Sequence, residues 1–166
     1  MAAVAMTVKA GVPLDIIVRV LKAFKGVEHR IEFVRELDGV TYYNDSKGTN
    51  PDSSIKALEA MTKPTLIIAG GYDKHSEFDG FIDAFGGKVK LMVLIGTTAP
   101  QIEKTARAHG FDNIINTDSL ENAVQICHDN AASGDVVLLS PACASWDMFP
   151  SYEVRGEKFK EIVNSL

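Results

Sequence analysis

Residues 43–51 bring an acid, a base, several hydrogen-bond donors and a glycine into one short stretch, Tyr-Asn-Asp-Ser-Lys-Gly-Thr-Asn-Pro. Side chains of both charges this close together can hold a small polar ligand, with the carboxylate as acceptor and the ammonium as donor. The stretch also has the features of an ordinary strand-to-helix connection, because Asn50 can cap a helix and Pro51 can occupy its first position. Taken alone, it is better explained as such a connection.

Three further polar segments follow apolar runs that have the composition of buried strands. Residues 70–75 read Gly-Gly-Tyr-Asp-Lys-His, residues 96–98 read Gly-Thr-Thr, and residues 140–147 read Ser-Pro-Ala-Cys-Ala-Ser-Trp-Asp. Because the carboxyl ends of parallel strands meet at one edge of a sheet, we expect all four polar segments to converge there. The paired glycines let the backbone approach a ligand, and Lys74 supplies a charge. Together the segments predict a small-molecule cleft.

The spacing gives no support to other chemistries that single residues suggest. Ser145 lacks a Gly-x-Ser-x-Gly elbow, which favours a hydroxyl donor over a nucleophile. Cys143, between two alanines, is typical of a buried structural cysteine. The four histidines show no metal-ligand spacing, and the chain has neither a Gly-x-Gly-x-x-Gly fingerprint nor a Gly-x-x-x-x-Gly-Lys-Ser/Thr phosphate loop. We therefore predict no catalytic residue and no metal site in these 166 residues.

The elements that must position the polar segments begin near residue 26, where apolar strand candidates alternate with helical patterns. This alternation predicts an α/β fold: a mostly parallel sheet of about six strands with helices on both faces. The Asp38-Gly39 pair is a strong signal for a tight turn, so the sheet is expected to start with one antiparallel hairpin. The candidate strands are residues 31–37, 40–44, 65–69, 91–95, 113–116 and 136–139, and the expected buried residues include Leu66, Ile67, Ile68, Val93, Leu94, Val137 and Leu138.

Capping residues and prolines predict where several helices begin. Asn50-Pro51 marks one helix start, and residues 98–101 and 118–121 have the spacing of capping boxes. Before the sheet, residues 2–10 and 13–24 are predicted to be two short helices separated by Gly11. Two such helices cannot make a core of their own, so we expect them to dock on the rest of the chain or on a partner that is missing.

Composition bounds the class of protein. With 166 residues, 46% of them apolar and 23% charged, the chain has the size of one soluble domain with a small appendage. A net charge of -5 without a cluster of lysines or arginines argues against nucleic acid as a partner. No apolar run reaches roughly 18 residues, so no membrane association is expected. Cys127 and Cys143 are too few for a disulfide framework, which favours a cytoplasmic location.

Four motifs, in order, resemble the Mur ligase family and in particular its D-glutamate-adding members. They are His-Arg-Ile-Glu at 29–32, Asn-Asp-Ser-Lys-Gly-Thr-Asn-Pro at 44–51, Gly-Gly-Tyr-Asp-Lys at 70–74, and Leu-Ser-Pro-Ala-Cys-Ala-Ser-Trp-Asp-Met-Phe at 139–149, the last followed by Tyr-Glu-Val-Arg-Gly at 152–156. The resemblance spans the whole chain. It implies that residues 1–26 are a helical remnant of the family's central ATPase domain and that residues 27–166 are its Rossmann-like carboxyl-terminal domain.

The same resemblance implies ligands for individual residues. Arg30, Asp45 and His29 match positions that meet ATP, the arginine being suited to phosphate oxygens and the aspartate to ribose hydroxyls. A second set matches positions that hold or line D-glutamate: Lys47, Thr49, Lys74, Ser145, Trp146 and Tyr152. Taken singly, Arg30 and Asp45 could instead form a surface ion pair, and Lys74 could be a solvated loop lysine.

The reaction that the resemblance implies is ATP-dependent amide formation in peptidoglycan precursor synthesis. ATP phosphorylates the alanyl carboxylate of UDP-N-acetylmuramoyl-L-alanine, and the amine of D-glutamate attacks the acyl phosphate. Magnesium is needed, but its ligands and the phosphate loop are expected outside this chain, in amino-terminal and central domains. The chain alone is then one inactive arm of an active site. Two alternatives stay open: a stand-alone module that binds a nucleotide or amino acid, and a structural α/β domain with polar loops.

Overall fold

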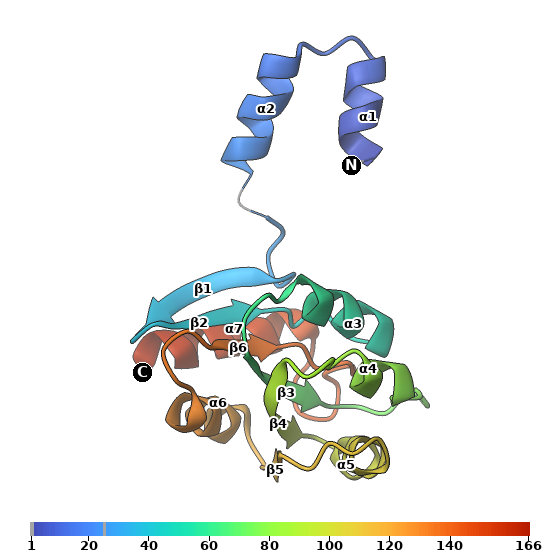
Figure 1. Cartoon of the computed structure of the whole chain (residues 1–166), viewed down its shortest axis with the longest axis vertical. Helices are drawn as coiled ribbons and strands as arrows, with labels where there is room; N and C mark the ends of the chain where they lie inside the picture. Colours follow the sequence, from blue (N-terminus) through green and yellow to red (C-terminus); the bar gives the residue numbers. More distant parts are fainter. Residues whose placement is uncertain (1, 25) are drawn as a thin grey trace.

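The computed structural model describes residues 2–24 and 26–166 and, within them, contains one six-stranded sheet and seven helices. The strand order is β1-β2-β6-β3-β4-β5, with β1 antiparallel to β2 and the other pairs parallel (Figure 1). This confirms the predicted fold class. The elements are α1 (Ala2–Lys9), α2 (Leu14–Ala23), β1 (Glu32–Leu37), β2 (Val40–Asn44), α3 (Pro51–Ala60), β3 (Thr65–Gly70), α4 (Asp79–Asp83), β4 (Val89–Ile95), α5 (Ala99–Ala108), β5 (Ile114–Asn116), α6 (Leu120–Asn130), β6 (Val136–Leu139) and α7 (Tyr152–Ser165).

The opening hairpin has the predicted turn. Leu37 of β1 pairs with Val40 of β2, and the two residues between them have positive φ angles, 52° at Asp38 and 78° at Gly39. Two positive φ angles in a two-residue loop are the requirement of a type I′ turn, whose twist matches that of the strands. The hairpin places β2 inside the sheet, next to β6, and so places its carboxyl end among those of the parallel strands.

The sheet is buried on both faces, which explains why its central strands are apolar throughout. Successive side chains of a strand point to opposite faces, so Ile67 packs in one core cluster and Leu66 in the other. The first cluster includes residues of α3, α4 and α5, and the second includes residues of α6 and α7. All seven residues predicted to be buried in strands are inaccessible to solvent: Leu66, Ile67, Ile68, Val93, Leu94, Val137 and Leu138.

The helix starts agree with the sequence only in part. Asn50 caps α3 as predicted, since its side chain accepts a hydrogen bond from the Ser53 amide at 2.9 Å. Thr98 is the N-cap residue of α5, so the predicted helix start is confirmed, but the capping box is wrong because the Thr98 hydroxyl makes no cap bond and instead bonds to the backbone of Gly71. The box predicted to start at Asp118 is shifted by one residue, because Ser119 caps α6.

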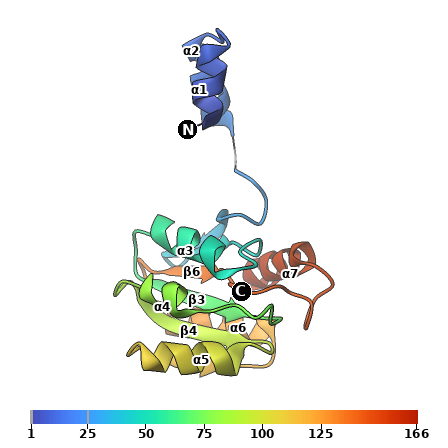
Figure 2. The same ribbon diagram turned by 90° about the vertical axis from the view of Figure 1, so that its right-hand side faces the viewer.

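Helices α1 and α2 form a pair that stands apart from the sheet in both views (Figures 1 and 2). Their bounds agree with the two short helices predicted from the sequence. Ile17 is the buried hydrophobic residue of the pair, whereas Leu14, Val20 and Leu21 are exposed. No helix within the described residues is long and apolar enough to span a membrane. The division of the chain at residue 26 into parts of two domains stays a prediction.

Candidate functional site

The four polar segments meet at the carboxyl edge of the sheet, as predicted. Strands β2, β3, β4 and β6 run parallel, so the loops that follow them emerge on the same side. Backbone hydrogen bonds then join loop to loop: Asp45 N to Leu139 O at 2.8 Å, Gly70 N to Pro141 O at 2.8 Å, Tyr72 N to Ala144 O at 2.9 Å and Thr98 N to Gly71 O at 3.0 Å. The site is therefore built on a fixed backbone.

Gly71 is required where the loop after β3 closely approaches the loop after β6. Its φ is +146°, and a Cβ added there would lie 2.3 Å from the carbonyl oxygen of Ala144. No side chain fits at that distance, because the obstacle is backbone. The absence of a Cβ at Gly71 therefore lets the loop after β3 pack against the loop after β6, which brings Lys74 and Ser145 to the same place.

Arg155 of α7 ties the loop after β2 to the loop after β6. Its guanidinium is buried and donates to Ser46 Oγ at 3.0 Å, Ser46 O at 2.9 Å, Cys143 O at 3.2 Å and Ala144 O at 3.4 Å. Burial lowers the pKa of Arg155 to about 10, so the group remains charged at neutral pH. Because the fork of donors spans both loops, Arg155 fixes their separation.

The sequence interpretation gave Arg155 no role, although a signal was present. Arg155, Phe159 and Val163 recur at helical spacing and are the buried long side chains of α7. An arginine on the buried stripe of an amphipathic helix must satisfy its donors internally, which marks it as structural or functional. The sequence could not indicate that its partners would be backbone carbonyls of the site loops.

A small hollow of about 110 Å³ opens where these loops meet, lined by Thr49, Lys74, Ala144, Ser145, Trp146 and Tyr152. Five of these are residues that the family resemblance placed around D-glutamate. The hydroxyl of Ser145 is buried and finds no hydrogen-bond partner among the described residues. An unpaired buried hydroxyl costs free energy, so this wall of the hollow is suited to a polar ligand. The Lys74 ammonium lies 5.5 Å from the centroid of the Trp146 ring.

Lys47, the sixth residue of that set, lies at the boundary between two hollows. Its ammonium donates to the Tyr152 hydroxyl at 2.7 Å and lies 4.4 Å from the centroid of the same ring. Lys47 also lines a larger hollow of about 320 Å³, whose walls include Arg30, Ile31, Asp45, Gly48, Asp52, Ser53, Lys56 and Ala57. Three cationic side chains therefore face the larger hollow, one of which also touches a residue of the smaller one.

Asp45 is the buried acid of the larger hollow. Its Oδ2 accepts from the Ser140 hydroxyl at 2.7 Å and its Oδ1 accepts from the Ile31 amide at 3.2 Å. Burial raises the pKa of Asp45 to about 6, and the hydrogen bonds from Ser140 and Ile31 oppose that rise. The carboxylate is therefore mostly ionised at neutral pH, its oxygens are held in place, and Arg30 lines the same hollow.

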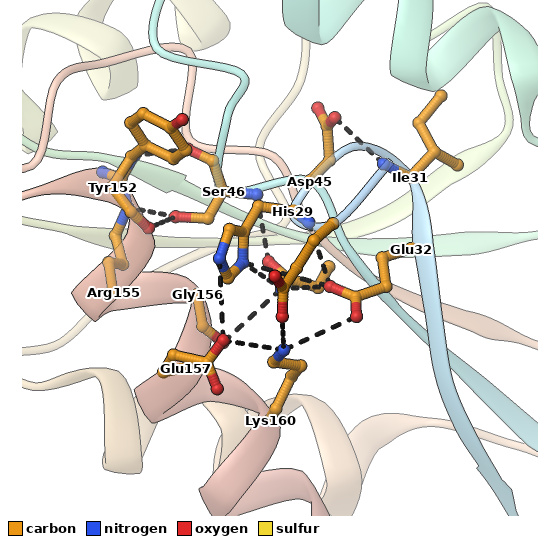
Figure 3. Close-up of polar contacts among 12 residues, drawn as sticks. His29, Ile31, Glu32, Asp45, Ser46, Tyr152, Arg155, Gly156, Glu157 and Lys160 are labelled. Carbon is orange, nitrogen blue, oxygen red and sulfur yellow. Dashed lines mark hydrogen bonds and ion pairs between the residues drawn. The ribbon is translucent and has the colours of Figure 1, made fainter. Parts of the chain in front are cut away.

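His29 lies away from this hollow, unlike Arg30 and Asp45, with which the family resemblance grouped it. Its Nδ1 is 3.0 Å from Asn44 Nδ2 and its Nε2 is 3.6 Å from a carboxylate oxygen of Glu157. The ring packs edge-on against Tyr152, and Figure 3 shows it between the loop after β2 and helix α7. In this arrangement His29 braces the site, whereas Arg30 and Asp45 face the hollow.

One group of side chains has metal-ligand spacing among the described residues: Glu28, His29 and Glu157. These residues do not fit a magnesium ion, because the ammonium of Lys160 already lies 2.7 Å from Glu28 Oε1 and 2.8 Å from Glu157 Oε1. Magnesium requires a nearly octahedral shell of oxygens, and a cationic side chain between the two carboxylates excludes it. No magnesium site is assigned to the described residues.

Comparison with known proteins gives a consistent picture. The family model described as Mur ligase, glutamate ligase domain, matches residues 29–143. The chain is 61% identical over 165 residues to the UDP-N-acetylmuramoylalanine--D-glutamate ligase of Lachnospira eligens, and 55% identical over 168 residues to that of Thermoanaerobacter sp. strain X514. The matches cover 99% and 100% of this chain but 37% of each relative. The chain thus spans little more than a third of their length.

The fold has counterparts among solved structures. The UDP-N-acetylmuramate-alanine ligase of Thermotoga maritima superposes with a TM-score of 0.71 at 16% sequence identity, over 99% of this chain and 36% of that one. At this identity the likeness concerns the fold alone. It nevertheless extends over nearly all of the residues compared, including those before the sheet.

Proposed function

Since this chain belongs to the Mur ligase family, through the glutamate ligase domain at residues 29–143, we propose that it forms the amino-acid-binding and nucleotide-binding arm of an ATP-dependent ligase. The reaction joins D-glutamate to UDP-N-acetylmuramoyl-L-alanine during the synthesis of peptidoglycan precursors. The rest of that active site lies in amino-terminal and central domains, with residues 1–26 belonging to the central one. Such an enzyme works in the cytoplasm, where its nucleotide substrates are present.

The observation that carries the proposal is the chemistry of the smaller hollow. The Ser145 hydroxyl is buried without a partner, and Lys74, Thr49 and Tyr152 line the same space. Three hydroxyls and an ammonium suit the carboxylates of an amino-dicarboxylic acid, because charged acceptors form the strongest bonds with such donors. D-glutamate has two carboxylates, and the adjacent Lys47 adds a second cation.

The larger hollow supports the nucleotide half of the proposal. Arg30, Lys47 and Lys56 provide cations for phosphate oxygens, and a planar guanidinium binds such oxygens through two parallel bonds. Asp45 is mostly ionised at neutral pH and is held by two donors. Its oxygens are suited to accept hydrogen bonds from ribose hydroxyls. His29 does not line this hollow, so we assign it to bracing the site rather than to direct contact with ATP.

The arrangement acts by positioning the reactants. In the ligation, the amine of D-glutamate forms the new C–N bond with the acyl carbon while phosphate leaves, and the amine loses a proton. Carboxylates fixed by Lys74, Ser145 and Thr49 leave the amine as the free end of the amino acid. Lys47 links the two hollows, so the amino acid is held beside the phosphates rather than at a distance. Magnesium supplies charge neutralisation at the phosphates from ligands in other domains.

A chimera tests the proposal. We would replace the matching 165 residues of the Lachnospira eligens ligase with this chain and measure phosphate release with ATP, magnesium, the UDP-linked substrate and D-glutamate. We expect the chimera to turn over. Lys74→Ala should raise the KM for D-glutamate by about ten- to a hundredfold, because a charge-assisted hydrogen bond to a carboxylate is worth roughly 1.5 to 3 kcal/mol. The KM for ATP should stay near that of the parent.

The matched control is Lys104→Ala, which removes the same charge from an exposed position on α5. It should leave both KM values unchanged. A folded but inactive parent chimera, with no D-glutamate bound, would favour the stand-alone or structural module instead. An active chimera in which Lys74→Ala and Lys104→Ala behave alike would remove Lys74 from the amino-acid site.

A further inference from the structure

Arg30 is held by a strained backbone. The φ angles of its two neighbours are positive, 61° at His29 and 47° at Ile31. Histidine adopts this region at times, but for a β-branched residue such as Ile31 it is an outlier. Strain of this kind persists only where the surroundings impose it, and it is common where a side chain must be aimed. The aimed side chain here is Arg30, which lines the larger hollow.

Hydrogen bonds to the loop after β2 explain part of this constraint. The Ile31 amide donates to Asp45 Oδ1 at 3.2 Å, and the Lys47 amide donates to the His29 carbonyl at 3.0 Å. On the other side of the turn, the His29 amide donates to Glu32 Oε2 at 3.0 Å. The turn that carries Arg30 is thus closed by two carboxylates: that of Asp45, which lines the same hollow, and that of Glu32, which follows the turn in the sequence.

Glu32 is in turn held by a lysine from a distant part of the chain. Lys160 of α7 places its ammonium 2.7 Å from Glu28 Oε1, 2.8 Å from Glu157 Oε1 and 3.5 Å from Glu32 Oε1 (Figure 3). The side chain of Lys160 is only 18% exposed. The other oxygen of Glu32 accepts from the His29 amide and from Asn44 Nδ2, both at 3.0 Å. One ammonium is therefore shared by three carboxylates, two of which, Glu28 and Glu32, flank Arg30 in the sequence.

The charge of Lys160 is secure in this setting. Burial by itself would lower the pKa of Lys160, but hydrogen bonds to Glu157 and Glu28 raise it above its ordinary value. Conversely, the hydrogen bond from Lys160 lowers the pKa of Glu28. If the ammonium were removed, the three carboxylates would lose their shared cation and keep only contacts such as those with His29 and Asn44. Their repulsion would move Glu32 away from the His29 amide, because like charges disfavour the ionised pair.

We propose that Lys160 is a positioning residue for the nucleotide: it holds Glu32 against the strained turn and thereby keeps the guanidinium of Arg30 at the phosphate-binding wall. Lys160 itself lies outside both hollows and touches no substrate. This inference rests on the proposed function, since it requires the larger hollow to bind the nucleotide. It also gives a role to the ammonium that lies against both carboxylates of the one group with metal-ligand spacing among the described residues.

The kinetic test uses the chimera with Lys160→Met, Lys160→Arg and a control, Lys158→Met. Lys158 lies on the same helix and pairs with Glu121 at 3.1 Å, away from the turn. We expect Lys160→Met to raise the KM for ATP by about tenfold, which is the effect of losing roughly one charge-assisted contact. The kcat and the KM for D-glutamate should stay within about twofold of the parent values. Lys160→Arg should restore most of the ATP affinity. Lys158→Met should resemble the parent.

A second measurement follows the turn itself in the isolated 166-residue chain. We expect the Ile31 amide to exchange with solvent about tenfold faster in Lys160→Met, as expected when a local structure opens more often, and at the parent rate in Lys158→Met. If Lys160→Met fails to fold, Lys160→Gln keeps a polar group and takes its place in both assays.

The outcomes separate this inference from the proposed function. If Arg30→Ala raises the KM for ATP but Lys160→Met does not, the positioning role is wrong and the nucleotide site stands. If Arg30→Ala leaves ATP kinetics unchanged, the nucleotide assignment itself fails. An equal rise in Lys158→Met and Lys160→Met would show a general effect of charge, and it would also overturn the proposal.

Discussion

At the scale of single residues, Asp45 connects three separate segments of the site, a role that the sequence does not indicate. It follows β2 directly, accepts from Ser140 of the loop after β6, and accepts from Ile31 in the turn before β1. These donors stabilise its ionised form, whereas burial favours the neutral form and is the larger effect, so the pKa rises to about 6. A buried carboxylate whose ionised form is destabilised by desolvation is typical of a functional site.

The raised pKa predicts a pH dependence of stability. The unfolded carboxyl ionises near 3.8 and the folded one near 6, so between these values the folded chain binds more protons. Stability therefore falls as pH rises through this window and levels off above it. Relative to Asp45→Asn, the wild type should lose on the order of 3 kcal/mol of unfolding free energy between about pH 4 and pH 7.

Urea unfolding of both chains across this pH range measures the difference, and the comparison cancels the other titrating groups. Parallel profiles for wild type and Asp45→Asn would show that Asp45 has an ordinary pKa in the folded chain.

Individual residues also show which parts of the site the sequence predicts and which it does not. Lys74 and Ser145 are 71 positions apart in the sequence, yet they line one hollow because the loops that carry them follow parallel strands. That convergence follows from topology and is predictable. The placement of His29 is not, because the positive φ at His29 turns its ring toward α7. The partners of Arg155 are equally hidden, since three of the four are carbonyl oxygens, which every residue possesses.

At the scale of elements, hydrophobic periodicity and turn chemistry predict most of the fold. Continuous apolar runs identify the buried parallel strands, and Asp38-Gly39 identifies the antiparallel hairpin. Cap residues are less informative, because their side chains can bond elsewhere. Thr98 has the right type and spacing for a cap, yet its hydroxyl bonds to the Gly71 backbone and so connects the loops after β3 and β4. Tertiary contacts override the local signal there.

Loop contacts at Gly71 give a prediction at this scale. Gly71→Ala places a methyl group against the Ala144 carbonyl, so we expect the unfolding free energy to fall by roughly 2 to 4 kcal/mol. The smaller hollow should widen as the two loops separate, and D-glutamate affinity in the chimera should fall with it. Gly110→Ala is the matched control, because Gly110 has φ +79° with no atom within 4 Å of the added Cβ.

The control substitution should cost only about 1 to 2 kcal/mol, from backbone conformation alone. Chemical denaturation measures both values. Equal losses for the two variants would mean that the loop after β6 yields to the methyl group, and that Gly71 matters for its φ rather than for close approach.

At the scale of the whole molecule, the sheet and its helices form a complete unit. The two core clusters, as far as the described residues show, draw on residues from 31 onward and on none from α1 or α2. The pair α1 and α2 exposes Leu14, Val18 and Leu21. Deleting residues 1–25 should therefore change the unfolding free energy of the remainder by less than about 1 kcal/mol, since distant parts without shared contacts are nearly additive.

Unfolding followed by tryptophan fluorescence at Trp146 reports on the remainder in both chains. The deletion should also reduce any self-association of the purified chain, because it removes exposed apolar side chains. A large loss of stability would mean that α1 and α2 dock on the sheet in solution.

The last prediction concerns activity. On the proposed function this chain supplies residues that hold substrates, but its 166 residues contain no phosphate-loop motif. The one group with metal-ligand spacing among the described residues is already bonded to the ammonium of Lys160. Positioning is most of what such a ligase contributes to phosphoryl and acyl transfer. The chain alone should therefore release no phosphate from ATP, with or without D-glutamate and the UDP-linked substrate, whereas the chimera should. Adding the other domains as a separate protein should restore little activity at ordinary concentrations, because a tether provides an effective concentration of about millimolar and separate pieces must meet an association cost of roughly 4 to 15 kcal/mol. Sustained turnover by this chain alone would show that it holds a phosphate-transfer site of its own.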